Sequence, residues 1–178
     1  MCGIAGFISL KNTISHSANH LENALERLSR RGPDNKGIYR DKKCELGHTR
    51  LSIIDTSENA NQPMIDSSND YVLVFNGEIY NYLDLKKELE NNNTQFKTKS
   101  DTEVLLYGLI KEGKSFINKL NGFFSFCFYN KKNQSYLLAR DRFGIKPLIY
   151  AFDENRLIYG SELKAILAYD IEKNIDKQ

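Results

Sequence analysis

Cys2 is the residue of this sequence whose type and position point most directly to chemistry. If Met1 is removed, Cys2 becomes the N-terminal residue and carries a thiol and a free α-amine together. The α-amine has a reference pKa of about 7.7–8.0 and the thiol one of about 8.5, so the amine can take the thiol proton near neutral pH. Nucleophile and general base would then form one unit. The alternative is that Cys2 is merely a small second residue, because position two alone is a weak signal.

Three further places carry side chains that fit such a nucleophile. Asn76-Gly77 follows the apolar run 71–75 and puts a side-chain amide beside a glycine N–H, which together can form an oxyanion hole. The same pair is also typical of a hairpin turn. Arg50 can clamp a carboxylate or form a surface salt bridge. Asp101 can bind an amino group or merely favour the dipole of the helix that it begins.

Hydrophobic periodicity and turn signals predict the elements that must position these residues. Strands are expected at 3–10, 37–41, 44–54, 71–75, 123–129, 136–140, 148–152 and 156–160. Helices are expected at 15–30, at 82–91 behind an Asn81 cap, from the capping box at 100–103 to Gly113, and briefly near Ser161. The nearly continuous apolar run 71–75 predicts a strand covered on both faces, ending at the Asn76-Gly77 turn. Antiparallel strands with helices in separate blocks predict an α+β fold with helices layered on sheets.

Composition limits the class of protein. The 178 residues suit one domain, and 25 Lys and Arg against 23 Asp and Glu give a net charge of +2. That balance excludes a strongly basic nucleic-acid binder, and no apolar run approaches the roughly 18 residues of a membrane span. We therefore expect neither a nucleic-acid nor a membrane partner. Because no secretory signal is apparent, the expected location is the cytoplasm.

Metal sites and disulfides are not indicated. The three cysteines are widely spaced, so Cys44 and Cys127 are interpreted as core thiols. His16 and His20 have helical spacing, but no acidic residue or cysteine nearby in the sequence completes a ligand set, which favours a solvated helix and no metal. For His48 a structural hydrogen bond is expected. The charged segment 140–147 is interpreted as a structural turn beside the site or toward a partner domain.

Eight ordered motifs covering essentially the whole chain resemble the N-terminal glutaminase domain of glutamine-hydrolysing asparagine synthetases. The motifs are MCGIAGF (1–7), RGPD (31–34), GHTRLSIID (47–55), QPM (62–64), FNGEIYN (75–81), SDTE (100–103), ARDRFGIKPL (139–148) and SELKAIL (161–167). The domain is a class II glutamine amidotransferase, an N-terminal-nucleophile hydrolase. The resemblance implies a four-layer αββα sandwich of antiparallel sheets, with the domain over residues 1–170 and a polar tail or linker at 171–178.

The resemblance also implies roles for individual residues. Cys2 would attack the side-chain amide of glutamine, with its α-amine as general base, and form a γ-glutamyl thioester. The Asn76 side chain and the Gly77 N–H would hold the oxyanion. The other implied residues bind glutamine: Arg50 takes the α-carboxylate, Asp101 with Glu78 takes the α-ammonium group, and backbone near Leu51 and Ile53 lines the amide pocket.

In the family, ammonia passes to a synthetase domain or subunit that activates aspartate with ATP. The Ser-Gly-Gly-x-Asp-Ser pyrophosphate loop of that domain does not occur in this sequence. No cofactor is therefore expected on this chain, and ATP and Mg²⁺ are expected only on the missing synthetase domain. Expected partners are L-glutamine and that synthetase, with a homodimer possible. The alternative is a catalytically silent module for glutamine sensing or docking within an amidating complex.

Overall fold

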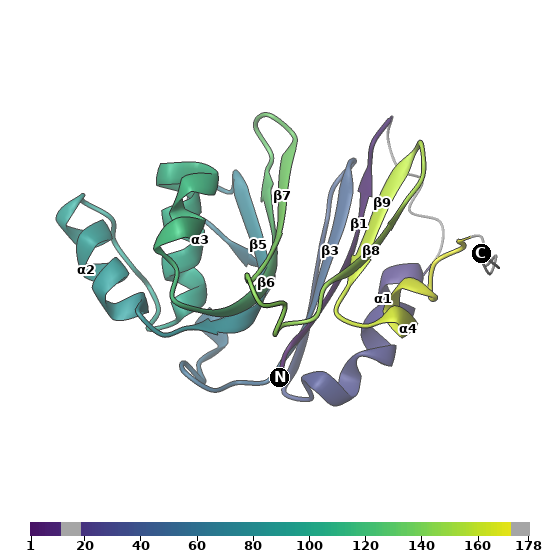
Figure 1. The fold of residues 1–178 in the computed structure, drawn as a ribbon, viewed down its shortest axis with the longest axis horizontal. Helices are drawn as coiled ribbons and strands as arrows, with labels where there is room; N and C mark the ends of the chain where they lie inside the picture. Colours follow the sequence, from purple (N-terminus) through teal and green to yellow (C-terminus); the bar gives the residue numbers. More distant parts are fainter. Residues whose placement is uncertain (12–18, 172–178) are drawn as a thin grey trace.

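Two antiparallel β-sheets lie face to face at the centre of the protein, and helices cover both outer faces (Figure 1). A computed structural model describes residues 1–11 and 19–171. The five-stranded sheet has the order β2 (Asn35–Arg40), β3 (Cys44–Arg50), β1 (Gly3–Ser9), β9 (Arg156–Gly160) and β8 (Ile149–Phe152). The four-stranded sheet has the order β4 (Met64–Ile65), β5 (Tyr71–Ile79), β6 (Gly122–Asn130) and β7 (Ser135–Arg140).

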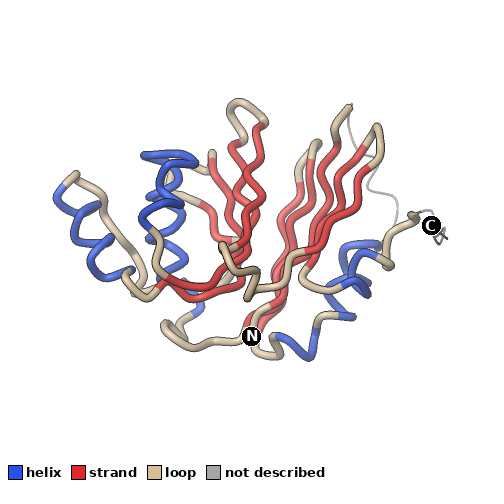
Figure 2. Tube along the Cα trace, in the orientation of Figure 1, coloured by secondary structure: helices blue, strands red, loops and turns tan. Residues whose placement is uncertain are grey.

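Each sheet has its own helical layer (Figure 2). Helices α1 (His20–Arg27) and α4 (Leu163–Ile166) pack on the five-stranded sheet, and α2 (Tyr82–Asn91) and α3 (Asp101–Glu112) lie on the side of the four-stranded sheet. Three 3₁₀ segments lie in the connections: η1 (Ser29–Arg31), η2 (Glu58–Ala60) and η3 (Gly113–Lys119). The predicted α+β, four-layer αββα sandwich is confirmed. In residues 1–11 and 19–171, no helix is long and apolar enough to cross a membrane.

The apolar run at the start of β5 is covered on both faces, as predicted. Val72 and Val74 pack between the two sheets, in a cluster that also contains Cys44 and Cys127. Leu73 and its neighbours on the other face belong to the cluster under α3, which α2 covers in turn. The two cysteines are fully buried, which confirms their interpretation as core thiols.

Helix α3 begins and ends close to where its sequence signals predict. The Ser100 hydroxyl accepts a hydrogen bond from the Thr102 N–H at 3.1 Å, as an N-cap should. The Glu103 carboxylate does not close the capping box; it accepts instead from the N–H groups of Lys97 and Thr98. Gly113 ends the helix at φ +60°, a conformation that glycine adopts without strain. These contacts fix the start of α3, which carries Asp101.

Tertiary contacts change several predicted boundaries. The predicted turn at Asn76-Gly77 is wrong: β5 continues to Ile79, because residues 76 and 77 pair with Ser125 and Phe124 of β6. Pairing with a central strand outweighs the local turn preference of Asn-Gly. Strand β3 ends at Arg50, four residues before the predicted limit, and residues 51–54 form an irregular segment instead.

Helix α2 has the predicted bounds of 82–91, but the predicted side-chain cap differs. Asn81 holds the N-cap position of α2, but its side chain donates to the Lys119 carbonyl and accepts from the Asn121 N–H rather than capping the helix. In the helix predicted at 15–30, residues 15–18 lie outside the described residues, as does His16, and α1 gives way to η1 after Arg27. His20 is not simply solvated: its Nδ1 lies 3.0 Å from the Ala168 carbonyl oxygen.

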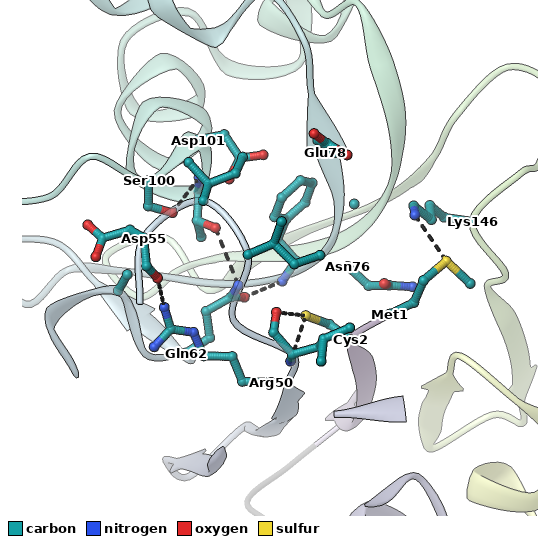
Figure 3. Close-up of a pocket in the computed structure, with 17 residues that line it drawn as sticks. Met1, Cys2, Arg50, Asp55, Gln62, Asn76, Glu78, Ser100, Asp101 and Lys146 are labelled. Carbon is teal, nitrogen blue, oxygen red and sulfur yellow. Dashed lines mark hydrogen bonds between the residues drawn. The ribbon is translucent and has the colours of Figure 1, made fainter. Parts of the chain in front are cut away.

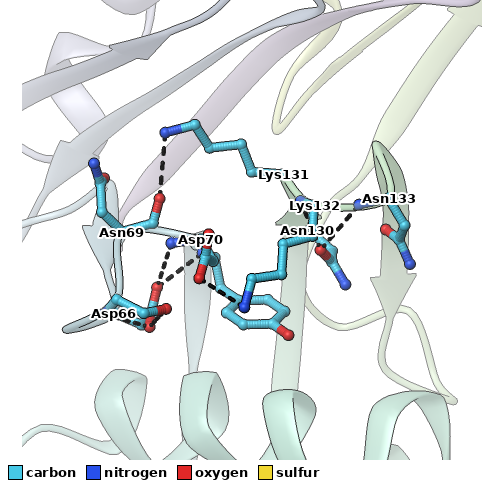
Figure 4. A network of polar contacts seen from close by, with 9 residues as sticks. Asp66, Asn69, Asp70, Asn130, Lys131, Lys132 and Asn133 are labelled. Atoms are coloured by element: carbon cyan, nitrogen blue, oxygen red, sulfur yellow. Dashed lines mark hydrogen bonds and ion pairs between the residues drawn. The ribbon is translucent and has the colours of Figure 1, made fainter.

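Side chains stabilise the turns at the start of β5 (Figure 4). The Asp66 carboxylate accepts hydrogen bonds from the N–H groups of Ser68, Asp70 and Tyr71. Lys132, in the turn between β6 and β7, forms an ion pair with Asp70 at 2.9 Å. These contacts hold β5 and the β6–β7 hairpin together at the end of β5 away from the pocket described next.

Candidate active site

All eight residues that the sequence analysis placed in a site line one open pocket. They are Cys2, Arg50, Leu51, Ile53, Asn76, Gly77, Glu78 and Asp101. The pocket forms where β1 begins, β3 ends, β5 nears its end and α3 starts (Figure 3). The fold thus brings together side chains that are up to 99 positions apart in the sequence, and the predicted set is complete.

The Cys2 thiol sits at the start of β1 against one backbone segment. Its Sγ accepts a hydrogen bond from the Leu51 N–H at 3.4 Å and lies 3.6 Å from the Leu51 carbonyl oxygen. Burial raises the pKa of the Cys2 thiol, while the Leu51 N–H and the charge of Arg50 act in the opposite direction. The resting group is therefore a thiol, and a nucleophilic role requires a base. The Arg31 Nε fixes the same residue by donating to the Cys2 carbonyl at 2.8 Å.

Asn76 presents a buried and unpaired donor to the pocket. Its side chain is 1% exposed, and Nδ2 has no hydrogen-bond partner among the residues that the structure describes. Leaving such a donor unsatisfied costs about 1–3 kcal/mol, so its retention calls for an explanation such as a ligand. At the adjacent Gly77 a Cβ atom would lie 2.4 Å from the Phe123 carbonyl oxygen, so β6 leaves no room for a side chain.

Arg50 is held rigidly at the end of β3. Its Nη1 donates to the Ser57 carbonyl at 2.9 Å and to Asn61 Oδ1 at 2.6 Å, and its Nη2 donates to the Asp55 carbonyl. Three of the five guanidinium N–H donors are engaged in this way. Arg50 is 6% exposed, so the predicted alternative of a surface salt bridge is wrong. A buried, oriented guanidinium group with two donors remaining suits a carboxylate ligand.

Asp101 supplies a buried carboxylate to the pocket, in addition to the positive charge of Arg50. It is 5% exposed, and its Oδ2 accepts a hydrogen bond from the Ile79 N–H at 3.0 Å. Burial, with the nearby charge of Glu78 adding to it, raises the pKa of Asp101 to about 6. Glu78 is exposed at the pocket. A cationic ligand group between these carboxylates would offset both effects.

The segment 140–147 is structural and borders the pocket, which confirms its interpretation as a turn beside the site. The Asp141 carboxylate accepts hydrogen bonds from the N–H groups of Phe124, Ile145 and Lys146. The loop thereby places Lys146 in the pocket lining, where its Nζ lies 3.1 Å from the Met1 Sδ. The predicted structural hydrogen bond of His48 is confirmed too, since its Nε2 donates to a strand carbonyl of β5 at 3.1 Å.

Sequence reasoning assigned no role to Gln62, which is 6% exposed and lines the pocket. It lies in the QPM motif, and its side chain contacts both β5 and α3. Asn61 and Asp55, which anchor Arg50, were also without a role. The QPM motif was the signal that could have pointed to Gln62. The hydrogen-bond partners of Gln62 are distant in the sequence, so they are recognised only in the folded chain.

Comparisons with known proteins identify the family of the chain. The model of the glutamine amidotransferase domain family matches residues 1–178. Asparagine synthetase [glutamine-hydrolyzing] 3 of Bacillus subtilis is 37% identical over 99% of this chain and 29% of its own length. Asparagine synthetase B of Escherichia coli is 40% identical over 94% of this chain and 30% of its own length. The chain therefore spans about a third of the curated relatives that it matches.

A solved structure with the same fold is the glutamine phosphoribosylpyrophosphate amidotransferase of B. subtilis, with a TM-score of 0.76. It is 24% identical, over 94% of this chain and 43% of that one, so this likeness concerns the fold. The family match and these relatives show that this chain belongs to the glutamine amidotransferase domain family, and among these relatives it is similar to part of the asparagine synthetases.

Proposed function

We propose that this chain hydrolyses L-glutamine to glutamate and ammonia through a γ-glutamyl thioester on Cys2. The observation that carries the proposal is the position of the Cys2 thiol in one pocket with the unpaired Asn76 Nδ2 and two buried charged groups, Arg50 and Asp101. These groups match the two ends and the reacting amide of free glutamine. Their separate anchors, on β1, β3, β5 and α3, preorganise the pocket before the substrate arrives.

The reaction follows from the groups present. The Cys2 Sγ attacks the side-chain carbonyl carbon of glutamine, and its proton passes to the Cys2 α-amine. The oxyanion is held by Asn76 Nδ2 and the Gly77 N–H. The C–N bond of the substrate amide then breaks as the protonated α-amine of Cys2 gives its proton to the leaving nitrogen, and ammonia departs. Water, giving a proton to the same amine, attacks the thioester, and glutamate and the free thiol are released.

Substrate choice rests on charge at both ends of the amino acid. Arg50 binds the α-carboxylate, and Asp101 with Glu78 binds the α-ammonium group. A peptide-bound glutamine lacks both charges, so it would leave buried polar groups without partners. Rejection of such analogues is strong for that reason.

Glutamine affinity is expected to fall as the pH drops below about 6. The raised pKa of Asp101, about 6, means that its carboxylate is protonated below that pH and no longer attracts an ammonium group. KM for glutamine should therefore rise on the acid side, in a series of measurements from pH 5 to 8. In Asp101→Asn, KM should be high at every pH and this acid rise should vanish. An acid rise that persists unchanged in Asp101→Asn would contradict the assignment.

Removal of Met1 is expected to switch the activity on. While Met1 is attached, the nitrogen of Cys2 is an amide and cannot act as a base, and Met1 itself lines the pocket. Intact-mass measurement should show active preparations to be lighter than the full sequence by one methionine residue. A chain blocked from processing should release no ammonia. Full activity in a chain whose mass includes Met1 would contradict the role of the α-amine, and an inactive processed chain would favour the silent module.

We infer further that the ammonia serves an ATP-dependent amidation, with aspartate as the first acceptor to test. The support is the naming of the matched relatives as glutamine-hydrolysing asparagine synthetases, of which this chain covers about a third. The test adds the purified chain to a candidate synthetase domain with glutamine, aspartate, ATP and Mg²⁺. Asparagine formation that depends on glutamine would support the proposal; ammonia release without transfer to aspartate would call for another acceptor.

A further inference from the structure

One edge of β5 lacks a neighbouring strand where the pocket begins. Strand β4 pairs only with Val72 and Leu73, and beyond them no strand among residues 1–11 and 19–171 pairs with the edge of β5 opposite β6. Backbone groups of alternate residues point to that edge. Side chains satisfy two of them: the Phe75 N–H donates to Gln62 Oε1 at 2.6 Å, and the Ile79 N–H donates to Asp101 Oδ2 at 3.0 Å.

Gly77 lies midway between these two anchored positions. By the same alternation its N–H points to the free edge, on the side of the pocket that Gly77 lines. The Gln62 and Asp101 side chains therefore take the place of a neighbouring strand at Phe75 and Ile79. The Gly77 N–H between them is left to bind a ligand. Asp101 belongs to the substrate site already described, whereas Gln62 has no role in that site.

Both polar atoms of the Gln62 side-chain amide are hydrogen-bonded. It is 6% exposed, and its Nε2 donates to the Thr102 hydroxyl on α3 at 3.3 Å while its Oε1 accepts from Phe75. This orientation of the amide is fixed, since a backbone N–H can only donate. On the same residue of β5, the carbonyl of Phe75 accepts from His48 Nε2 at 3.1 Å. Both polar backbone groups of Phe75 are thus held directly before Asn76 and Gly77.

We propose that Gln62 is a positioning residue for the oxyanion site: it ties β5 to α3 at Phe75 and so sets where Asn76 Nδ2 and the Gly77 N–H lie relative to the Cys2 thiol. The inference rests on the proposed glutaminase function and extends it to a residue that touches no reacting atom. Its physical basis is that oxyanion donors act only when they are aimed at the developing charge. A displacement of about 1 Å can cost about 100-fold in rate.

The test compares Gln62→Met with Gln62→Glu in the processed chain. Methionine has similar length but offers no strong acceptor to the Phe75 N–H, whereas glutamate retains an oxygen there. We expect kcat to fall by about 10- to 100-fold in Gln62→Met, with KM changed less than about 3-fold. Gln62→Glu should keep more of the wild-type kcat. Thr102→Val, which removes only the contact on α3, should cause a smaller loss than Gln62→Met.

A second measurement separates positioning from general loosening of the pocket. The γ-aldehyde analogue of glutamine forms a thiohemiacetal, in which a new S–C bond makes the aldehyde oxygen resemble the oxyanion. Its affinity should fall in parallel with kcat/KM in Gln62→Met, while the affinity for glutamate, the product, should stay near that of the wild type. Leu89→Ala, in the part of the apolar core where α2 packs against α3, serves as a destabilised control that removes no hydrogen bond at the β5 edge.

The outcomes distinguish the two proposals. If the wild-type chain releases ammonia and Gln62→Met keeps its kcat, or loses affinity for glutamate as strongly as for the aldehyde, the positioning role is overturned. A Gln62→Met loss that matches that of an equally destabilised Leu89→Ala would overturn it as well. If the processed wild-type chain neither releases ammonia nor binds the aldehyde at Cys2, the proposed function itself fails.

Discussion

Replacing Cys2 with alanine is expected to reduce ammonia release from glutamine to the uncatalysed background. The thioester route has no other nucleophile in the pocket, because Cys44 and Cys127 are buried in the core between the sheets. The fold should persist, since within residues 1–11 and 19–171 the hydrogen bonds of the Cys2 Sγ join it only to the backbone of Leu51, a residue of the pocket lining. We expect the free energy of unfolding to change by less than about 1 kcal/mol. Ammonia release, thermal melting and glutamine binding should be measured on the same preparation.

Matched variants and labelling make the Cys2 result specific. Cys127→Ala removes a thiol of the core and should leave turnover at the wild-type level. An electrophilic glutamine analogue should add once per wild-type chain, at Cys2, and not at all to Cys2→Ala. Ammonia release by Cys2→Ala at the wild-type rate would exclude the thioester, and an adduct on Cys44 or Cys127 would contradict the assignment of the nucleophile.

Local signals predicted the elements that depend on local physics. The apolar run at 71–75 predicted a doubly covered strand, and Val72 and Leu73 indeed pack on opposite faces of the four-stranded sheet. The start of α3 followed from the Ser100 cap, and its end from Gly113. In these cases the preference of the chain segment and the demands of packing coincide.

Local signals were wrong at two places where a distant partner binds the residue concerned. Asn76-Gly77 has the composition of a turn, yet β6 supplies a partner for both residues and extends β5 to Ile79. Asn81 has the composition of a cap, yet Lys119 and Asn121 take its side-chain hydrogen bonds. None of these partners is visible in a window of sequence, because they lie between 38 and 49 positions away.

The candidate site was predicted more completely than the fold around it. Residue type and position pointed to Cys2, Arg50, Asn76, Gly77 and Asp101, and the resemblance added Leu51, Ile53 and Glu78. The fold brings all eight to one pocket. The contacts that hold them were not predicted. Gln62 tying Phe75 to α3, and Asn61 holding Arg50, depend on which strand edge lacks a neighbour and which loop closes on it. The free strand edge and the loop that closes on it exist only once the sheets have assembled, so a local reading of the sequence does not predict them.

Asn76 offers the sharpest test of the chemistry. In Asn76→Ala we expect kcat to fall by about 10²- to 10³-fold, the usual loss when one oxyanion donor is removed. KM for glutamine should change little, because the α-carboxylate and α-ammonium groups are bound by Arg50 and Asp101. Asn76→Asp should lose more turnover than Asn76→Ala, since a carboxylate in place of the amide would repel the oxyanion.

Ser125 provides the matched control for this prediction. It lies directly across from Asn76 on β6, is fully buried, and its hydroxyl, like Asn76 Nδ2, has no hydrogen-bond partner among residues 1–11 and 19–171. It does not line the pocket, so Ser125→Ala should retain the wild-type kcat. Each variant removes a buried polar atom that has no hydrogen-bond partner. Neither variant should therefore lower the melting temperature as much as the loss of a hydrogen bond would. The contrast in kcat between two neighbours of equal burial then measures what the Asn76 amide does for the transition state. If KM alone rose in Asn76→Ala, the amide would be a substrate contact rather than an oxyanion donor.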